Sequence, residues 1–189
     1  MMLRYNGCVS ACQPLPLLWL LSDARNDAAL ETALAALPRR SGFVYRHYHL
    51  AAPERRARFD ALAAIARQRG HCVVVARSGE EAQGWGADGL YGKASALGTG
   101  GEGLLRLATA HDGAEMQQGL AAGADAIFLS PVFATASHPG ATPLGPQGFS
   151  VLSQQSHVPV IALGGMTRAR AQAMNWPRWG AIDGLSAEP

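Results

Sequence analysis

Short apolar runs alternate with helix-like stretches along almost the whole chain, and this alternation limits the possible folds more than any other feature. The runs lie at 15–23, 42–50, 71–77, 87–92, 104–112, 124–133, 158–165 and 179–187. Several are apolar without interruption, as is typical of parallel strands covered by helices. The pattern predicts an α/β chain in which each strand is followed by a crossover.

The stretches between the runs carry helix signals of uneven strength. Residues 52–70 begin with Pro53 and Glu54 and end at Gly70, as a helix does. Further helices are predicted at 27–38, 113–123, 145–156 and 167–176, and a short helix or turn at 78–86. The segment 93–103 is rich in glycine, and its order is left open.

Eight strand–helix units predict a compact (β/α)8 TIM barrel, in one domain over 1–189, rather than an open doubly wound sheet. The 189 residues are few for this fold, and the eighth run lies at the end of the chain. We therefore expect shortened or missing helices and a reduced terminal helix. Partial opening of the barrel and support from a second subunit, as in a homo-oligomer, both stay open.

Charge and composition exclude several classes of protein. The 16 Lys and Arg residues against 14 Asp and Glu give a net charge of +2, too small for a nucleic-acid surface. Arg55, Arg56 and Arg58 are interpreted as the solvated face of a helix. The apolar stretch at 14–21 is too short to span a bilayer. The three cysteines form no zinc-like or disulfide pattern, so a cytoplasmic location is expected.

Residues that can bind an anion follow several predicted strands. In a barrel of this kind the functional site lies at the carboxyl ends of the strands. The amides of Gly164 and Gly165, with Ser186 after the last strand, predict a phosphate site, although a pair of glycines alone can be a plain tight turn. The residues collected at these ends are Asp23, Arg46, Tyr48, Arg77, Lys93, His111, the 134–140 loop, Gly164, Gly165 and Ser186.

Side-chain alternation in the second strand gives a separate prediction. Val44, Arg46 and Tyr48 share the inward face, whereas His47 and His49 point toward the helices and are interpreted as structural.

The segment "GADAIFLSPVFATASHPGATPLGPQGF", followed by "VPVIALGGM", resembles thiamine phosphate synthase and its thiazole-tautomerase relatives. The resemblance is strong over 105–165 and weaker elsewhere. It implies a TIM barrel that joins a pyrimidine diphosphate to a thiazole phosphate, giving thiamine phosphate and pyrophosphate. Such a protein mainly stabilises the departing charge and holds the two partners close.

The resemblance also implies roles for individual residues. Loop hydroxyls, the glycine turn and the last strand would bind phosphate, through Thr135, Ser137, Gly164, Gly165, Leu185 and Ser186. A Ser-x-His-type signature ends the fifth strand as Thr109 and His111, which with Arg46 and His138 are the catalytic candidates.

The chain departs from the family pattern where a diphosphate and magnesium would bind. Only Arg46 remains of the family's second-strand signature, and Ala76-Arg77 stands where an Asn-Asp pair is expected. The segment after the fourth strand, around Ser95, lacks the second magnesium aspartate, and His138 replaces a loop lysine. Because magnesium prefers carboxylate oxygens, we predict no metal site and no cofactor.

Two accounts fit these departures. Arg77 could replace the metal as the positive charge beside a diphosphate, assisted by Arg46 and His138, because arginine binds phosphate well. Alternatively, the protein binds thiazole phosphate or thiamine phosphate without coupling. A tautomerase is a third reading, but Pro131 stands where those relatives have a histidine, and proline is no general base. His138 or His111 would then have to replace it. An unrelated phosphate-sugar barrel, such as an epimerase, is disfavoured by the hydroxyl-rich loop.

Overall fold

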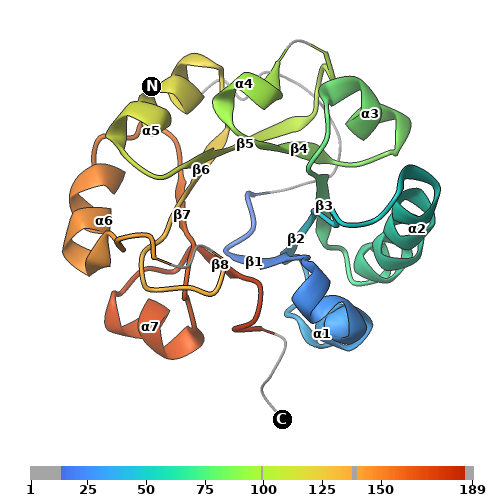
Figure 1. Cartoon of the computed structure of the whole chain (residues 1–189), viewed down its shortest axis with the longest axis horizontal. Helices are drawn as coiled ribbons and strands as arrows, with labels where there is room; N and C mark the ends of the chain where they lie inside the picture. The colour runs from blue at the N-terminus through green and yellow to red at the C-terminus, as the bar shows by residue number, and fades with distance from the viewer. Residues whose placement is uncertain (1–13, 99, 138–139, 186–189) are drawn as a thin grey trace.

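Eight short parallel strands close into a barrel in the computed structural model, which describes residues 14–98, 100–137 and 140–185 (Figure 1). Each strand pairs with the next, and β8 pairs back with β1. The strands are β1 (Leu18–Leu21), β2 (Gly42–Tyr45), β3 (Cys72–Val75), β4 (Gly89–Gly92), β5 (Leu105–Ala110), β6 (Ala126–Leu129), β7 (Val160–Ala162) and β8 (Trp179–Ala181). This order confirms the predicted (β/α)8 TIM barrel. The closed order excludes the partly open barrel, an alternative that the sequence left open.

Helices cover the outside of the strands (Figure 1). They are η1 (Ala24–Ala29), α1 (Leu30–Ala36), α2 (Ala52–Gln68), α3 (Gly79–Gly84), α4 (Ala94–Leu97), α5 (Gly113–Ala121), α6 (Gly145–Ser153) and α7 (Arg168–Ala173). The expected shortening is clearest in α4, which has four residues and lies where the helix signal is weak. Among the described residues, no helix is both long and apolar enough to cross a membrane.

Most strands end before the predicted residue, and the difference is largest for β2 and β8. β2 stops at Tyr45 rather than at residue 50, because His47 adopts a positive φ of 25° and the chain turns directly after it. β8 stops at Ala181 rather than at residue 187, and the described residues 182–185 form bends and a turn. The functional side chains after these strands therefore stand on loops.

Aromatic rings fill the interior of the barrel. The indole of Trp19 occupies the space beside Gly42, where a Cβ would lie 2.1 Å from the ring atom Cε3. On the other neighbouring strand, a Cβ on Gly180 would lie 3.0 Å from Leu21 Cδ1 and 3.1 Å from the Trp19 Cβ, so this position is also crowded. The Phe128 ring meets Trp19 edge-on at 5.6 Å, and Tyr91 meets Phe128 at 5.2 Å. These three rings form a continuous packed column inside the strands.

A second apolar layer lies between the strands and the helices. Phe43 and Tyr45 of β2 point into this layer, where Tyr45 packs on Phe59 of α2 with ring centroids 5.4 Å apart. Val44 points into the barrel instead. This alternation agrees with the faces predicted for the second strand.

Arg55 of α2 links β2 to β3. The sequence had suggested that Arg55 belongs to a solvated face, and this interpretation was wrong. Its side chain is buried, and Nη2 donates to the carbonyl oxygens of Arg46 at 2.5 Å and Ala76 at 3.2 Å. The Tyr45 hydroxyl in turn donates to the Arg55 carbonyl at 2.8 Å. Arg58 is also engaged, through Asp27 and Glu31. The helix was predicted correctly, but its charged face packs against its neighbours.

We predict that Gly42→Ala lowers the free energy of unfolding by about 3 kcal/mol, because the new methyl group overlaps the Trp19 ring. The matched control is Gly84→Ala at the end of α3, where a Cβ meets nothing within 4 Å. Removing this helical glycine should leave stability unchanged or raise it by up to about 1 kcal/mol. Urea denaturation of both variants measures the difference, and equal midpoints would contradict the packing account.

Candidate functional site

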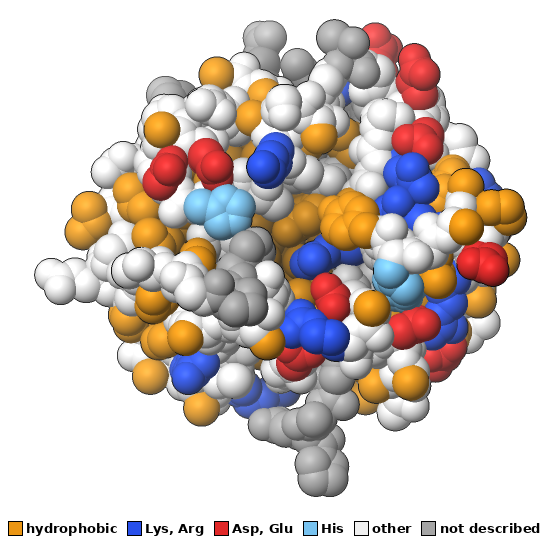
Figure 2. All heavy atoms as spheres, viewed as in Figure 1, with side chains coloured by type: hydrophobic (Ala, Val, Ile, Leu, Met, Phe, Trp, Pro, Cys, Tyr) orange, Lys and Arg blue, Asp and Glu red, His pale blue; other side chains and the backbone are white. Residues whose placement is uncertain are grey.

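A cavity of about 640 Å³ opens at the carboxyl ends of the strands. Figure 2 shows a hollow near the middle of this face, bordered by hydrophobic and basic side chains. The residues around it come from β2, β4, β5, β6, β7 and β8 or from the loops that follow them. This volume is in the range of small-molecule sites, so we treat the cavity as the candidate site.

Glycines shape one side of the cavity, which we call the β6–β8 wall (Thr135, Ser137, Gly164, Gly165 and Arg170). Gly164 and Gly165 have φ values of 89° and 60°, a conformation that favours glycine. A Cβ on Gly165 would also lie 2.5 Å from the Ala134 carbonyl oxygen. The turn therefore needs both glycines, as the sequence suggested, and it brings backbone groups to the edge of the cavity.

The hydroxyls of this wall are held by neighbouring groups. The Thr135 Oγ1 accepts from the Ser137 amide at 3.4 Å. The Ser137 Oγ accepts from Arg25 Nη2 at 2.8 Å. Arg25 also pairs with Asp23 at 2.9 Å and with Asp183 at 3.2 Å. This arginine joins the loops after β1, β6 and β8. It is not among the site residues predicted from the sequence.

Arg170 adds a positive charge to the same wall. Its guanidinium lies 4.5 Å above the Phe133 ring and donates to the Gly165 carbonyl oxygen. A basic side chain beside the glycine turn suits an anionic ligand. Arg170 lies in α7, the helix that follows the two glycines, and this position in the sequence could have identified it as a site residue.

Thr109 and His111 line the cavity from β5, between the two sides of the barrel. The Nδ1 atom of His111 lies 2.7 Å from the Glu115 carboxylate, which also accepts from the His111 amide at 2.8 Å. Glu115 belongs to the first turn of α5. The imidazole is therefore fixed in orientation by its own helix.

The opposite side, which we call the β2–β4 wall (Arg46, Tyr48, Tyr91 and Lys93), carries side-chain donors. Arg46 Nη2 lies 3.4 Å from Asp23, and the Arg46 guanidinium lies 5.7 Å from the Tyr48 ring centroid. Burial alone would raise the pKa of Asp23, but hydrogen bonds from Arg25 and the charges of Arg25 and Arg46 hold it below its usual value. Asp23 therefore stays ionised and orients both arginines.

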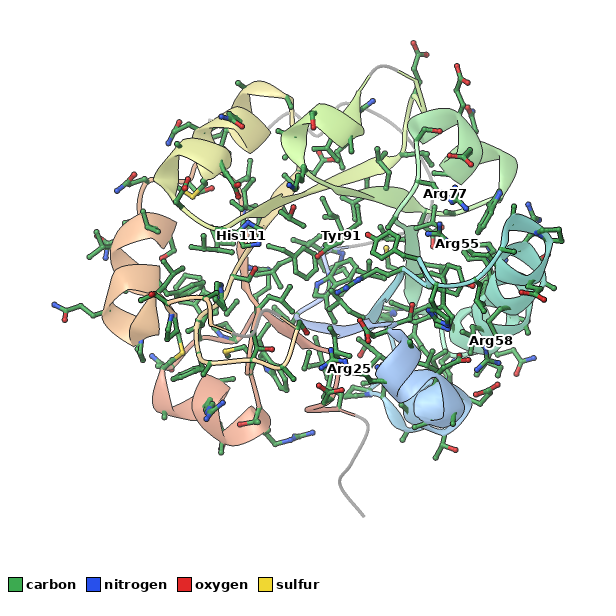
Figure 3. The ribbon with its side chains drawn as sticks, viewed as in Figure 1. Arg25, Arg55, Arg58, Arg77, Tyr91 and His111 are labelled. Atoms are coloured by element: carbon green, nitrogen blue, oxygen red, sulfur yellow. The ribbon has the colours of Figure 1, made fainter. Side chains whose placement is uncertain are left out.

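Arg77 does not reach the cavity, which corrects the hypothesis that it replaces a metal there. Val74 and Ala76 point into the barrel, so the next residue points outward. The Arg77 guanidinium lies 5.5 Å from the Trp85 ring centroid and 3.3 Å from Glu81. Figure 3 shows Arg77 on the side of β3 that faces α3, whereas Tyr91 and His111 lie within the ring of strands.

Three other predicted residues are not among the described residues that line the cavity. Leu185 is half-buried, packs against the apolar layer under the helices and does not line the cavity. His138 and Ser186 lie outside the described residues. The cavity thus brings together Arg46, Thr109, His111, Thr135, Ser137, Gly164 and Gly165 from the predicted set.

The cavity does not suit magnesium. Among its described lining residues the one carboxylate is Asp183, which is paired with Arg25. The end of β4 offers Tyr91 and Lys93, and a lysine repels a cation.

A second group of possible ligands, Asp27, His47 and His49, lies beside the β2–β4 wall. Arg58 already holds the Asp27 carboxylate at 2.8 Å, and the same carboxylate accepts from buried His47 at 2.7 Å. This group is better explained as a structural network, as predicted for the two histidines.

A family model described as thiamine monophosphate synthase matches residues 18–176. The chain is 51% identical over 45 residues to "Putative thiamine-phosphate synthase 2" of Aquifex aeolicus, which is 24% of each chain. It is 36% identical over 64 residues to a thiamine-phosphate synthase of Chloroflexus aurantiacus, which is 33% of this chain and 30% of that one. The aligned segments thus span less than a third of these two relatives.

Among solved structures, a thiamine phosphate pyrophosphorylase from Pyrococcus furiosus superimposes with a TM-score of 0.74. The match covers 92% of this chain and 89% of that one at 20% sequence identity. At this identity the likeness concerns the fold.

We predict that the protein loses stability as the pH falls from about 7 to 5. Burial lowers the pKa of His47 and of His71 in the folded protein, although hydrogen bonds to Asp27 and Leu34 act against this. The unfolded chain then takes up protons near pH 6.5 that the folded protein does not bind. Each histidine can contribute at most about 1.4 kcal/mol per pH unit.

Urea denaturation at several pH values measures this dependence. His47→Gln should reduce the slope of unfolding free energy against pH and leave the part due to His71. A slope identical to that of the unmodified protein would contradict the assignment.

Proposed function

The chain belongs to the thiamine monophosphate synthase family, and on this premise we propose that it couples hydroxymethylpyrimidine diphosphate to thiazole phosphate. The C–O bond between the pyrimidine methylene and the diphosphate breaks, and its electron pair leaves with pyrophosphate. The thiazole nitrogen then forms a C–N bond to the methylene carbon, which gives thiamine phosphate.

The observation that supports the proposal is that hydrogen-bond donors and basic side chains line opposite sides of one cavity. In a closed barrel of eight strands, β2–β4 and β6–β8 face each other across the interior. The β6–β8 wall offers glycine amides, hydroxyls and Arg170, which suit the monophosphate of the thiazole. The β2–β4 wall offers Arg46 and Lys93, which suit a diphosphate.

Such an arrangement promotes the coupling by binding and orientation. Holding two reactants face to face replaces a bimolecular encounter by a step within one complex. Basic side chains at the β2–β4 wall would stabilise the charge that grows on departing pyrophosphate. Thr109 and His111 lie between the walls, where the reacting ends of the two ligands would meet.

We also propose that the reaction needs no magnesium, since the described lining of the cavity lacks a suitable set of carboxylates. Arg46 and Lys93 take over the role of positive charge that the sequence analysis gave to Arg77. The ligands of the proposed reaction are small phosphate-bearing molecules. A cytoplasmic location and a homo-oligomer stay predictions from the sequence.

We predict that purified protein with both substrates releases pyrophosphate, and that EDTA leaves the rate unchanged. Coupled phosphate detection measures turnover. Absence of turnover with measurable binding of thiazole phosphate would instead support a non-catalytic binding protein. Strict dependence on magnesium would contradict the metal-free site.

Two arginine variants test whether the positive charge that the reaction needs lies inside the cavity or outside it. Arg46→Ala should lower kcat/KM by about 10- to 100-fold, because a charge-assisted hydrogen bond to the diphosphate is lost. Arg77→Ala should change kcat/KM less than about twofold, since this side chain lies outside the cavity and an exposed ion pair contributes little. The reverse order would restore Arg77 as the charge at the site. Thermal unfolding of both variants checks that they remain folded.

A further inference from the structure

Tyr91 carries a hydroxyl group that the fold itself does not use. The residue is 8% exposed, points inward from β4 and lines the cavity (Figure 3). Across residues 14–98, 100–137 and 140–185 its hydroxyl has no hydrogen-bond partner. The residue lines the cavity and its donor has no partner in the fold, so the hydroxyl is available to a ligand.

Packing does not explain the hydroxyl. The Tyr91 ring meets Phe128 edge-on at 5.2 Å, a contact that a phenylalanine would make equally well. Tyr45 offers the contrast within the same barrel. It is fully buried, and its hydroxyl donates to the Arg55 carbonyl at 2.8 Å and so supports the link between β2 and α2.

The surroundings of the Tyr91 hydroxyl favour an anionic partner. Arg46 lines the same wall, and its Nε is buried without a hydrogen-bond partner in the described structure. Lys93 lies two residues further along and makes no ion pair with a described carboxylate. Burial raises the pKa of Tyr91 far above neutral, so the phenol keeps its proton and can donate. The wall thus offers three kinds of donor, each of which can bind an oxygen of an anionic ligand.

We propose that the Tyr91 hydroxyl donates a hydrogen bond to an oxygen of the diphosphate, beside Arg46 and Lys93. Tyr91 is then a ligand-binding residue, and the β2–β4 wall binds the diphosphate through side-chain donors alone. The inference rests on the proposed function, because it assigns the diphosphate to this wall. Its test is a binding measurement, which does not require turnover.

The experiment is calorimetric titration of the protein with inorganic pyrophosphate in EDTA. Thiazole phosphate is kept at saturation so that the β6–β8 wall is occupied. Tyr91→Phe should raise the Kd for pyrophosphate by about 10- to 100-fold, the usual cost of losing a hydrogen bond to a charged group. Its Kd for thiazole phosphate should stay within about twofold, and its melting temperature should be unchanged or higher.

Tyr45→Phe is the matched control. It also removes one phenolic hydroxyl, but that hydroxyl is buried and has a partner within the fold. Its melting temperature should fall, whereas its Kd for pyrophosphate, measured at a temperature where it is folded, should not change. This opposite pair of effects separates a ligand contact from a structural one.

Other results would overturn the inference. These are equal pyrophosphate affinity in Tyr91→Phe and the unmodified protein, equal loss of both ligands in Tyr91→Phe, or no pyrophosphate binding by the unmodified protein. Pyrophosphate binding that depends on Tyr91 without any coupling would support the inference while contradicting the proposed function. Coupling that is unaffected by Tyr91→Phe would support the proposed function and contradict the inference about Tyr91.

Discussion

The packing of Trp19 against Gly42 is the constraint on which the site depends. The indole needs the space that this glycine on the neighbouring strand β2 leaves, and it fills the barrel around β1. Phe128 and Tyr91 continue the column, so the interior holds no room for a ligand until the strands end. The column therefore sets the depth of the cavity, and its last ring places a hydroxyl where a ligand can meet it.

Charged side chains then fix the loops around the cavity. Arg25 holds Asp23, Asp183 and Ser137, which belong to the loops after β1, β8 and β6. Arg55 holds the ends of β2 and β3 from the outside, through two carbonyl oxygens. These links join loops far apart in the sequence. Short strands are therefore enough to hold the cavity in place, because side-chain hydrogen bonds fix the loops beyond the strand ends.

The sequence predicted the barrel well because short apolar runs that alternate with helix-like stretches report on which segments are buried. It predicted the inward position of Arg46 because successive side chains along a strand point to opposite faces. It failed for Arg77 because the family pattern was matched by position along the chain, whereas alternation from Val74 turns that side chain outward. The same reasoning on β4 would have found Tyr91. The bridges of Arg25 could not be predicted, since they depend on how three loops meet in space.

The two walls offer hydrogen-bond donors of different kinds, and in the proposed function this difference explains which half of the family pattern the chain keeps. On the β6–β8 wall the donors include backbone amides, and the turn accepts only glycine at Gly164 and Gly165. A substitution there would change the path of the backbone, so the motif is easily recognised. On the β2–β4 wall the donors are side chains on a strand end, where a carboxylate–metal pair can be exchanged for a lysine and a phenol without moving the backbone. The charge that a diphosphate needs can thus be supplied by other residues, while the fold that positions it stays the same.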